Sequence, residues 1–422
     1  MTRVLPAILV LLLPLCGQAF AQEQENKLEP PELDRYRRWG FLRARPGFEL
    51  SNLGYDSNIL FSSTGELVSD TTATLSPKLD GLVLLGSKAF ITLNEQFDYT
   101  LYIEHGDQNF WNNAFTTRAT VPFRSFGVFG QWSLDDVRFR PVDQEDIRIK
   151  SKRREFGIGL IFQPGWRTEI ELAGYANRWR YEDPQSQPVV VPVDDRLDRD
   201  EAWTTFDLSY HLRGRTSALL HFEDRQIEFR VPFIFQDPFT MQIVQIQRDT
   251  VERRALAGFR LGRGSSLIGH ALIGWSRIDA QDPVLPDLSE LIGELDATWI
   301  AGSRTRLRLR GERAPGFAVS SGNAYYLDTS GSIRTVHYFT HLFGGEFSVR
   351  RGRLDFPEAL AGTTRKDDTS HYELGVRMRL LNAADGRRVE YSLTVGGYRR
   401  DSNIAGFDQD KTTFGFGAVL GY

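Results

Sequence analysis

The chain has 422 residues, with 51 lysine and arginine residues against 55 aspartate and glutamate residues and a formal net charge of −4. This near balance gives no basis for nucleic-acid binding, and we expect no nucleic-acid partner. Cys16 is the only cysteine, which excludes a small scaffold held together by disulfide bonds.

Residues 1–21 have the features of a secretory signal peptide. An apolar run over residues 4–15 follows Arg3, and a site with small residues at its first and third positions ends at Ala21. The run is too short to cross a membrane as a helix, and no run of about twenty apolar residues follows it. We therefore expect an exported chain that is cleaved near Ala21.

Residues 22–40 are polar and interrupted by proline, and we expect them to form a periplasmic lead-in before the fold. From residue 41 on, no linker, low-complexity block or shift in composition interrupts the chain. A chain of this length could hold two or three soluble domains, but the uniform pattern predicts one continuous unit over residues 41–422.

The dominant pattern of this unit is a two-residue alternation of apolar and polar side chains. It is clear in ELIGELDATWI (residues 290–300), RTRLRLRGE (304–312) and HYELGVRMRLL (371–381). Successive side chains point to opposite faces only in an extended strand, so each segment predicts a β-strand with one apolar and one charged face.

Segments of this kind recur along the whole unit. The strands that we predict, in chain order, cover residues 41–54, 70–85, 88–104, 109–122, 125–140, 147–163, 166–182, 199–213, 215–231, 243–262, 265–279, 287–300, 303–320, 323–338, 341–355, 368–381, 387–401 and 408–422.

The connections between these strands alternate between short and long. Residues 86–87 and 164–165 are short connections, whereas residues 55–69 and 183–198 are long and polar. Short turns on one side and long loops on the other are typical of transmembrane barrels. Strands in soluble sandwiches and propellers are shorter, usually about five or six residues. We therefore predict an all-β, transmembrane, antiparallel up-and-down β-barrel in the bacterial outer membrane, with 18 strands, or 16 if one hairpin is counted in excess.

The end of the chain, KTTFGFGAVLGY, alternates aromatic and small residues. A last strand that ends on an aromatic residue resembles the signal by which the barrel-assembly machinery recognises outer-membrane barrels. An exposed apolar edge strand would also aggregate unless it closed onto the first strand. The expected assembly-signal residues, which would face membrane lipid, are Phe414, Phe416, Leu420 and Tyr422.

The sequence DSNI occurs at residues 56–59 and again at residues 401–404. Both copies follow outward-running predicted strands, so a closed barrel would place them on the extracellular rim beside the last strand. Asp, Ser and Asn start turns by bonding to nearby backbone groups. Their oxygens could also bind Ca²⁺, but turn chemistry is the stronger interpretation, and we predict no metal or cofactor. The rim-turn residues are Asp56, Asn58, Asp401 and Asn403.

The sequences YDSNI after the first strand and RDSNI…GFDQDKTTFGFGAVLGY at the end resemble those of a family of outer-membrane β-barrel porins associated with exopolysaccharide biosynthesis and export. The resemblance implies a barrel that helps a polymer or another solute to cross the outer membrane. It implies periplasmic polysaccharide-export components as partners, and it brings no catalytic residues.

If the apolar face of the barrel contacts lipid, the charged face lines the interior. Two interpretations remain open: an anion-attracting track, or neighbouring charge ladders that neutralise each other and stiffen the wall. The same face carries the acidic residues Glu49, Asp80, Glu169, Glu171, Asp207, Glu312 and Glu390. The predicted pore-lining residues are Arg43, Arg45, Arg118, Arg254, Arg260, Arg306, Arg308, Arg310, Arg377, Arg379, Glu294, Asp296 and Glu373.

The sequence thus predicts an outer-membrane channel that assists the export of extracellular polysaccharide, and not an enzyme. A general or anion-preferring solute porin is the first alternative, and a hydrolase with its site on the rim or a purely structural barrel is the second. His337 and His341 have the spacing of a helical metal pair, but they fall in a predicted strand and turn. Residues four apart in a strand are separated by about 13 Å, too far to share a metal ion.

Overall fold

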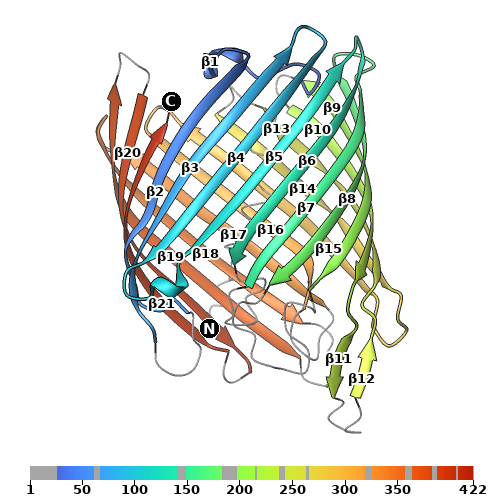
Figure 1. Cartoon of the computed structure of the whole chain (residues 1–422), viewed down its shortest axis with the longest axis vertical. Coiled ribbons are helices and arrows are strands. Elements are labelled where there is room, and N and C mark those ends of the chain that lie inside the picture. The colour runs from blue at the N-terminus through green and yellow to red at the C-terminus, as the bar shows by residue number, and fades with distance from the viewer. Residues whose placement is uncertain are drawn as a thin grey trace.

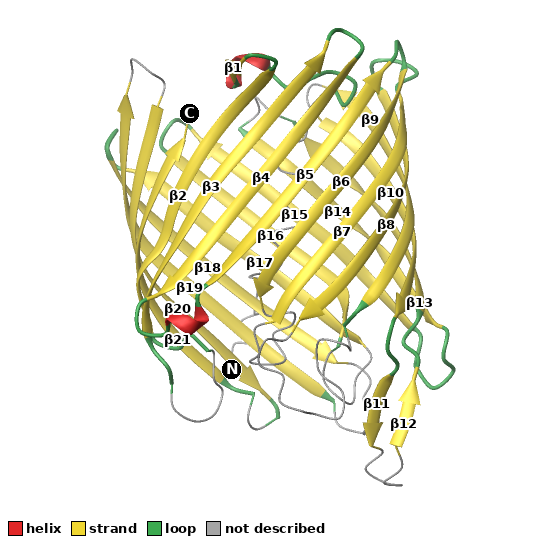
Figure 2. Cartoon of the chain, in the orientation of Figure 1, coloured by secondary structure: helices red, strands yellow, loops and turns green. Residues whose placement is uncertain are grey.

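The computed structural model describes residues 26–60, 67–139, 149–182, 197–213, 216–236, 243–262, 266–318, 325–356, 364–382, 387–404 and 407–421. Eighteen of the described strands form one closed antiparallel barrel (Figures 1 and 2). The barrel strands are β2 (Leu42–Asp56), β3 (Asp70–Leu85), β4 (Ala89–Tyr102), β5 (Phe110–Pro122), β6 (Phe126–Phe139), β7 (Ile149–Phe162), β8 (Thr168–Glu182), β9 (Arg199–Arg213), β10 (Thr216–Phe229), β13 (Thr250–Leu261), β14 (Leu267–Ala280), β15 (Leu288–Ala301), β16 (Thr305–Phe317), β17 (Tyr325–Tyr338), β18 (Phe343–Phe356), β19 (Arg365–Asn382), β20 (Arg387–Ser402) and β21 (Gln409–Gly421).

Strand β2 closes the barrel because it pairs with both β3 and the last strand, β21. Phe48 lies opposite Leu420 and Tyr55 opposite Phe414 in the β2–β21 register. The other barrel strands pair with their neighbours in chain order, and β10 pairs with β13. The prediction of an eighteen-stranded barrel, and not a sixteen-stranded one, is confirmed.

Contacts between strands that are not neighbours identify the inner face. Arg118 on β5 and Glu171 on β8 lie 3.4 Å apart although β6 and β7 separate their strands. Side chains can meet in this way only across the concave side of the sheet. On the opposite face of β7, Phe156, Ile158 and Leu160 are exposed. The barrel therefore has an apolar outer surface and a charged lumen, as the two-residue alternation predicts.

The two ends of the barrel differ in the length of their connections. Short turns such as residues 86–88 lie at the upper end in Figure 1, and the long connections lie at the lower end. One long connection carries a hairpin of β11 (Phe233–Gln236) and β12 (Ile243–Ile246). We name these ends the short-turn end and the long-loop end; in bacterial barrels the short turns face the periplasm.

The described part of the chain has two short helical turns, η2 (Leu33–Arg35) and η3 (Gly106–Gln108). Among the described residues, no helix has the length and apolar character needed to cross a membrane.

The prediction of a single strand over residues 243–262 is wrong. Strand β12 pairs with β11 in a small sheet of its own, and the barrel strand β13 begins only at Thr250. The side chain of Asp249 accepts a hydrogen bond from the backbone N–H of Phe229 at 2.7 Å. This bond fixes the point where the chain returns to the barrel, so the apolar run of β12 stays outside the barrel sheet.

The lumen is not polar throughout. At the long-loop end, the ring of Phe317 on β16 lies 5.3 Å from that of Phe229 on β10, although these strands are not neighbours. Phe317 packs against a buried apolar cluster that consists of Ile246, Ile278, Leu285, Leu288 and Tyr325. Apolar side chains therefore occupy part of the interior at this end.

The predicted periplasmic lead-in, residues 22–40, is described from residue 26 on. Lys27 contacts Glu171 on the inner face of β8, so the first described residues lie within the barrel rather than before it. Strand β1 (Arg37–Trp39) then pairs with β2. The predicted signal peptide, residues 1–21, and the terminal Tyr422 lie outside the described residues.

Candidate functional site

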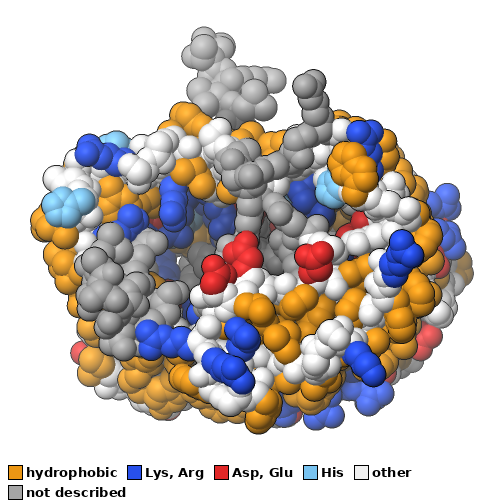
Figure 3. Space-filling model, turned by 90° about the horizontal axis from the view of Figure 1, so that it is seen from above, with side chains coloured by type: hydrophobic (Ala, Val, Ile, Leu, Met, Phe, Trp, Pro, Cys, Tyr) orange, Lys and Arg blue, Asp and Glu red, His pale blue; other side chains and the backbone are white. Residues whose placement is uncertain are grey.

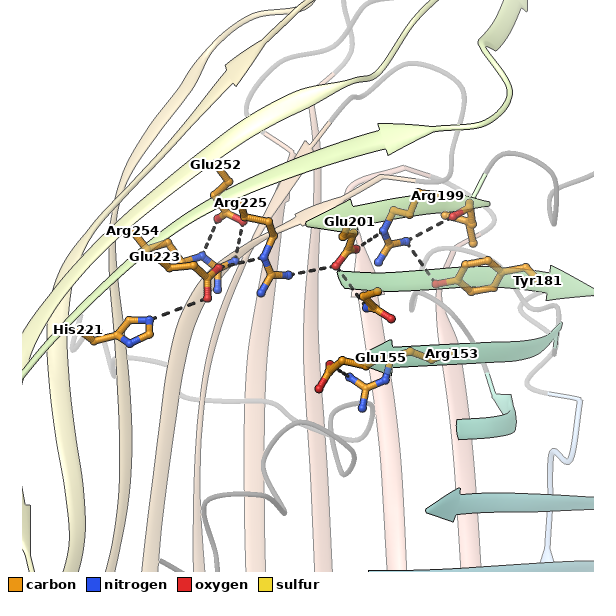
Figure 4. A network of polar contacts seen from close by, with 12 residues as sticks. Arg153, Glu155, Tyr181, Arg199, Glu201, His221, Glu223, Arg225, Glu252 and Arg254 are labelled. Atoms are coloured by element: carbon orange, nitrogen blue, oxygen red, sulfur yellow. Dashed lines mark hydrogen bonds and ion pairs between the residues drawn. The ribbon is translucent and has the colours of Figure 1, made fainter. Parts of the chain in front are cut away.

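One stretch of the lumen wall is lined by arginine–glutamate pairs (Figure 4). Four strands each carry one arginine and one glutamate two residues apart, and side chains at this spacing share a face of the strand. We name this set the β7–β13 network; its members are Arg153 and Glu155 on β7, Arg199 and Glu201 on β9, Glu223 and Arg225 on β10, and Glu252 and Arg254 on β13.

Charge-assisted hydrogen bonds join these pairs along the wall. Arg225 Nη1 donates to Glu201 Oε2 at 3.4 Å, and Arg199 Nε donates to Glu201 Oε1 at 2.6 Å. Arg254 donates from Nε and Nη2 to the two carboxylate oxygens of Glu252, at 2.7 and 2.9 Å. Glu201 and Glu252 are buried, so these arginines, and not water, compensate their charges.

Aromatic rings hold two of these arginines in place. The guanidinium group of Arg225 lies 4.7 Å from the ring centre of Trp203, and that of Arg199 lies 5.1 Å from the ring centre of Trp179. A cation is attracted to the face of an aromatic ring, so these contacts orient the arginines in addition to the ion pairs.

A second set of charged residues lines another stretch of the wall. Asp296 on β15 binds two arginines of β16: Arg308 Nη2 at 2.5 Å and Arg310 Nε at 3.2 Å. Further along, two glutamates each bind two arginines. We name this set the β15–β20 network; its members are Asp296, Arg308, Arg310, Arg334, Glu346, Arg377, Arg379 and Glu390.

Most arginines of the two networks are more exposed than their carboxylate partners, whereas Arg153 and Glu155 are equally exposed. The Arg334 side chain is 50% exposed and that of Glu346 is 0% exposed. The corresponding values are 22% for Arg225 and 3% for Glu201. The accessible surface of these ion pairs is therefore cationic, although the charges are nearly balanced in number. The histidine pairs differ, since Glu294 beside His270 is more exposed than the histidine.

Many predicted pore-lining residues take part in these contacts. Outside the two networks, Arg45 Nη2 lies 2.5 Å from Asp80 Oδ2, and Arg118 pairs with Glu171. Glu294 lies 3.0 Å from Nε2 of His270. The predicted residues that the networks bring together are Arg254, Arg308, Arg310, Arg377, Arg379 and Asp296.

The other predicted pore-lining residues are not members of the two networks. Arg43 and Arg306 form no ion pair with any residue in the described ranges, and Arg306 is exposed. Arg260 lies opposite His270 in the β13–β14 register. Glu373 lies between β18 and β20, opposite Ser348 and Gly396. Of the three predicted arginines on β16, at residues 306, 308 and 310, only the two farther from the short-turn end are therefore paired.

The sequence analysis missed most of the β7–β13 network. A local signal was present, because an arginine and a glutamate two residues apart occur in four strands of one region. We did not single out this spacing, which is shared by Arg153 and Glu155, Arg199 and Glu201, Glu223 and Arg225, and Glu252 and Arg254.

The two DSNI segments lie at the long-loop end, on either side of β21. Asp56 accepts a hydrogen bond from the backbone N–H of Asn58 at 3.0 Å, and Lys411 Nζ lies 2.5 Å from Asp56. Asn403 accepts a hydrogen bond from the backbone N–H of Lys366 at 2.7 Å, and Asp401 pairs with Arg399. Within the part of the chain that the structure describes, no group of three or more His, Cys, Asp or Glu residues could hold a metal ion.

Three of the predicted assembly-signal residues, Phe414, Phe416 and Leu420, lie on the outer face of β21. Phe414 and Leu420 are exposed, and Phe416 lies opposite Leu53 of β2 and Leu393 of β20. The row therefore contributes to the apolar outer surface where the barrel closes.

The inward-facing histidines have polar partners on the wall. His221 Nδ1 lies 2.8 Å from Asp207 Oδ1, and His211 Nδ1 lies 2.6 Å from Ser217 Oγ. His337, which faces outward on β17, pairs with the hydroxyl of Thr305 at 2.8 Å. These contacts hold the rings within the sheet.

Comparisons with known proteins add to this geometry. The family model described as "Putative beta-barrel porin 2" matches residues 148–422, well over half of the chain. No curated protein matches the chain in sequence.

Solved structures of several outer-membrane proteins are remotely similar in fold. OpdK from Pseudomonas aeruginosa has a TM-score of 0.46 and 15% identity, over 90% of this chain and 99% of OpdK. A BenF-like porin from Pseudomonas fluorescens Pf-5 has a TM-score of 0.46 and 10% identity, over 91% of this chain and 100% of the porin. The FrpB iron transporter from Neisseria meningitidis has a TM-score of 0.43 and 8% identity, over 90% of this chain and 81% of FrpB.

Proposed function

Because the chain belongs to the family described as "Putative beta-barrel porin 2" and is an outer-membrane β-barrel porin, we propose that it is a channel that prefers small anionic solutes. One observation carries this proposal: in the two wall networks, most arginines are more exposed than the carboxylates that they bind. Arg310 is 47% exposed and its partner Asp296 is 28% exposed, and the difference is larger for Arg334 and Glu346.

A solute in the lumen first contacts the side chains that are most exposed on the inner face of the wall. These are the guanidinium groups. Arginine binds carboxylate and phosphate oxygens through two parallel hydrogen bonds. Buried carboxylates neutralise much of the long-range field, so we expect a moderate preference for anions and not strict selectivity. Screening limits the effect further, since charges interact over about 10 Å at 0.1 M salt.

The test is the reversal potential of the purified barrel in a planar lipid bilayer under a KCl gradient. The test variants are Arg306→Gln and Arg310→Gln, on the lumen face of β16. The control is Arg154→Gln on β7, which removes the same charge from the outer face beside Phe156. A unit charge about 10 Å from the ion path changes the energy of an ion in water by about 0.4 kcal/mol, so each lumen variant should lower the anion-to-cation permeability ratio roughly twofold.

Two results would contradict the proposal. One is a wild-type barrel that passes potassium and chloride equally or prefers potassium. The other is an Arg154→Gln variant whose permeability ratio falls as far as those of the lumen variants. A barrel with no conductance at all would remove the channel function and favour a structural role.

Export of extracellular polysaccharide, which the sequence resemblance implies, is the weaker proposal. An arginine-lined wall would suit an acidic polymer as well as a small anion. However, residues 26–29 and the Phe317 cluster occupy parts of the lumen, which favours a small solute. Deletion of the gene distinguishes the two: an export channel should leave polymer in the periplasm, whereas a solute porin should leave polymer release unchanged.

A further inference from the structure

The first described residues of the chain lie against the inner face of the barrel wall at the short-turn end. The side chain of Asn26 accepts a hydrogen bond from Gln163 at 3.0 Å, next to the end of β7. Lys27 Nζ donates to Glu171 Oε2 at 2.9 Å and lies 3.5 Å from Glu169 Oε1, both on β8. We name residues 26–29 the N-terminal strap.

The neighbouring side chain of the strap fills an apolar hollow in the wall. Leu28 is 7% exposed and packs against Phe129, Ile161 and Ala173 on β6, β7 and β8. Gly127 leaves the space for it, because a Cβ atom at this position would lie 2.5 Å from Leu28 Cδ2. The hollow holds one leucine side chain because Ala173 is small and Gly127 has no side chain. We name this hollow the dock.

Charge and apolar burial act together in this dock. Glu171 is buried and already faces Arg118, and the ammonium group of Lys27 adds a second cation to it. Burial of a leucine side chain stabilises the docked strap by an amount comparable to the free-energy cost of ordering one or two residues. The dock is therefore strong enough to hold the strap and weak enough to release it.

The residues that follow the strap connect it to a different part of the wall. It contacts β6, β7 and β8, whereas β1, only eight residues further along, pairs with β2. Three barrel strands, β3 to β5, separate these two places. An extended chain spans at most about 3.3–3.6 Å per residue, so residues 30–36 are long enough to connect these two places at the short-turn end. Figure 3 looks onto the short-turn end and shows charged side chains around this opening.

We propose that the N-terminal strap is a tethered gate: Lys27 and Leu28 bind the lumen dock, the following residues narrow the short-turn mouth, and release of the strap widens the channel. The gate rests on the proposed channel function, because it acts on the same lumen. The ligand of the dock is thus a segment of the same chain, Lys27 followed by Leu28.

The test removes the dock without altering the strap. Gly127→Val places a side chain where Leu28 lies, and the control Gly130→Val lies on the same strand, with no atom within 4 Å of its new Cβ in the described structure. A second test variant, Leu28→Asp, changes the strap and leaves the barrel wall intact. It keeps the test valid if Gly127→Val folds poorly.

Two measurements are made on the full chain. Single-channel conductance in a planar bilayer reports the width of the path. Modification by an amine-reactive reagent, mapped by mass spectrometry, reports the accessibility of Lys27. Lys88 is exposed in the β3–β4 turn and serves as an internal reference for the reagent.

We expect Lys27 to react more slowly than Lys88 in the wild type and in Gly130→Val. Gly127→Val and Leu28→Asp should expose Lys27 to the reagent and raise the conductance. If Lys27 became reactive without a change in conductance, the gate would be refuted while the channel function stood. Equal reactivity of Lys27 and Lys88 in the wild type would refute the dock. If no variant conducted, the channel function would fail and the gate with it.

Discussion

The carboxylate of Glu346 on β18 lies beneath the guanidinium group of Arg334 on β17, with the glutamate fully buried and the arginine half exposed. Arg377 on β19 binds the other carboxylate oxygen. One buried anion thus holds two arginines at the lumen surface, and its removal affects more than one positive charge.

We predict that Glu346→Gln makes the channel more selective for anions. Loss of the carboxylate leaves Arg334 without this partner, and Arg377 keeps only Glu390. One uncompensated charge about 10 Å from the ion path should raise the anion-to-cation permeability ratio roughly twofold. The reversal potential measures this ratio.

The matched variant is Arg334→Gln, which should shift the reversal potential in the opposite direction. Glu346→Gln should also lower the free energy of unfolding by about 1–3 kcal/mol, since hydrogen bonds to charged groups are lost. Urea unfolding of the barrel in detergent measures this loss. Shifts of the same sign in the two variants would contradict the layered arrangement of charges.

The strand pair that closes the barrel has one position without room for a side chain. A Cβ atom at Gly54 of β2 would lie 1.9 Å from the backbone oxygen of Phe414 on β21, next to the irregularity in the register after Leu50. We predict that Gly54→Ala destabilises the closed barrel by about 1–3 kcal/mol, because the backbones must move apart. The folded fraction on unheated SDS gels measures closure.

The control for this variant is Gly415→Ala on the opposite strand. Its Cβ would have no described neighbour nearer than 3.7 Å. The barrel of Gly415→Ala should therefore close as the wild type does. A similar loss of folded fraction in both variants would show that the close approach at Gly54 is not the cause.

Much of the barrel could be predicted from the sequence because strand alternation is a local property. In β7, for example, the alternation over a few residues identifies which side chains face outward and which face inward. The bounds of β3 and β9 agree with the predicted ranges. Partner choice was harder to predict. Strand β12 has the apolar pattern of a barrel strand, but it pairs with β11 because Asp249 turns the chain after it.

The strap, and the choice of partners within the wall networks, could not be predicted by the same reasoning. Lys27 and Leu28 lie in a short polar segment with no periodic pattern. Their dock is built from strands that are brought together only by the register of the barrel. Likewise, strand alternation indicates that Arg225 and Glu201 face the lumen, but which carboxylate an arginine binds depends on how neighbouring strands are aligned.

The DSNI segments offer a test of turn chemistry against metal binding. Asn403 accepts a hydrogen bond from the N–H of Lys366 at 2.7 Å and donates one to the carbonyl of Thr364 at 2.9 Å. We predict that Asn403→Ala lowers the stability of the barrel by about 1 kcal/mol, the usual contribution of such bonds. Urea unfolding measures the change.

Chelation of calcium with EGTA should leave the wild-type unfolding midpoint unchanged. Asp401→Ala is the control, because Asp401 pairs with Arg399 at the exposed surface and such pairs contribute little. A fall in the midpoint after chelation, restored by added Ca²⁺, would support a metal site and not a turn.

Because Lys27 remains charged, we expect the strap to stay bound to the dock at moderately alkaline pH. The ammonium group lies near Glu171 and Glu169 on β8 and near Asp207 on β9. Burial alone would lower the pKa of Lys27, but the nearby carboxylate charges outweigh this effect and raise the pKa above its ordinary value.

A raised pKa fixes the sign of the pH dependence. The docked form binds the proton more tightly than the free strap, so the contribution of Lys27 is complete below the ordinary lysine pKa of about 10.4. It is lost only as the pH rises through the still higher pKa of the docked form. We therefore expect the ratio of Lys27 to Lys88 modification, and the conductance, to stay constant between about pH 7 and pH 9. A ratio that rose within this window would show that the strap leaves its dock while Lys27 is still charged, and that the ion pair does not hold it.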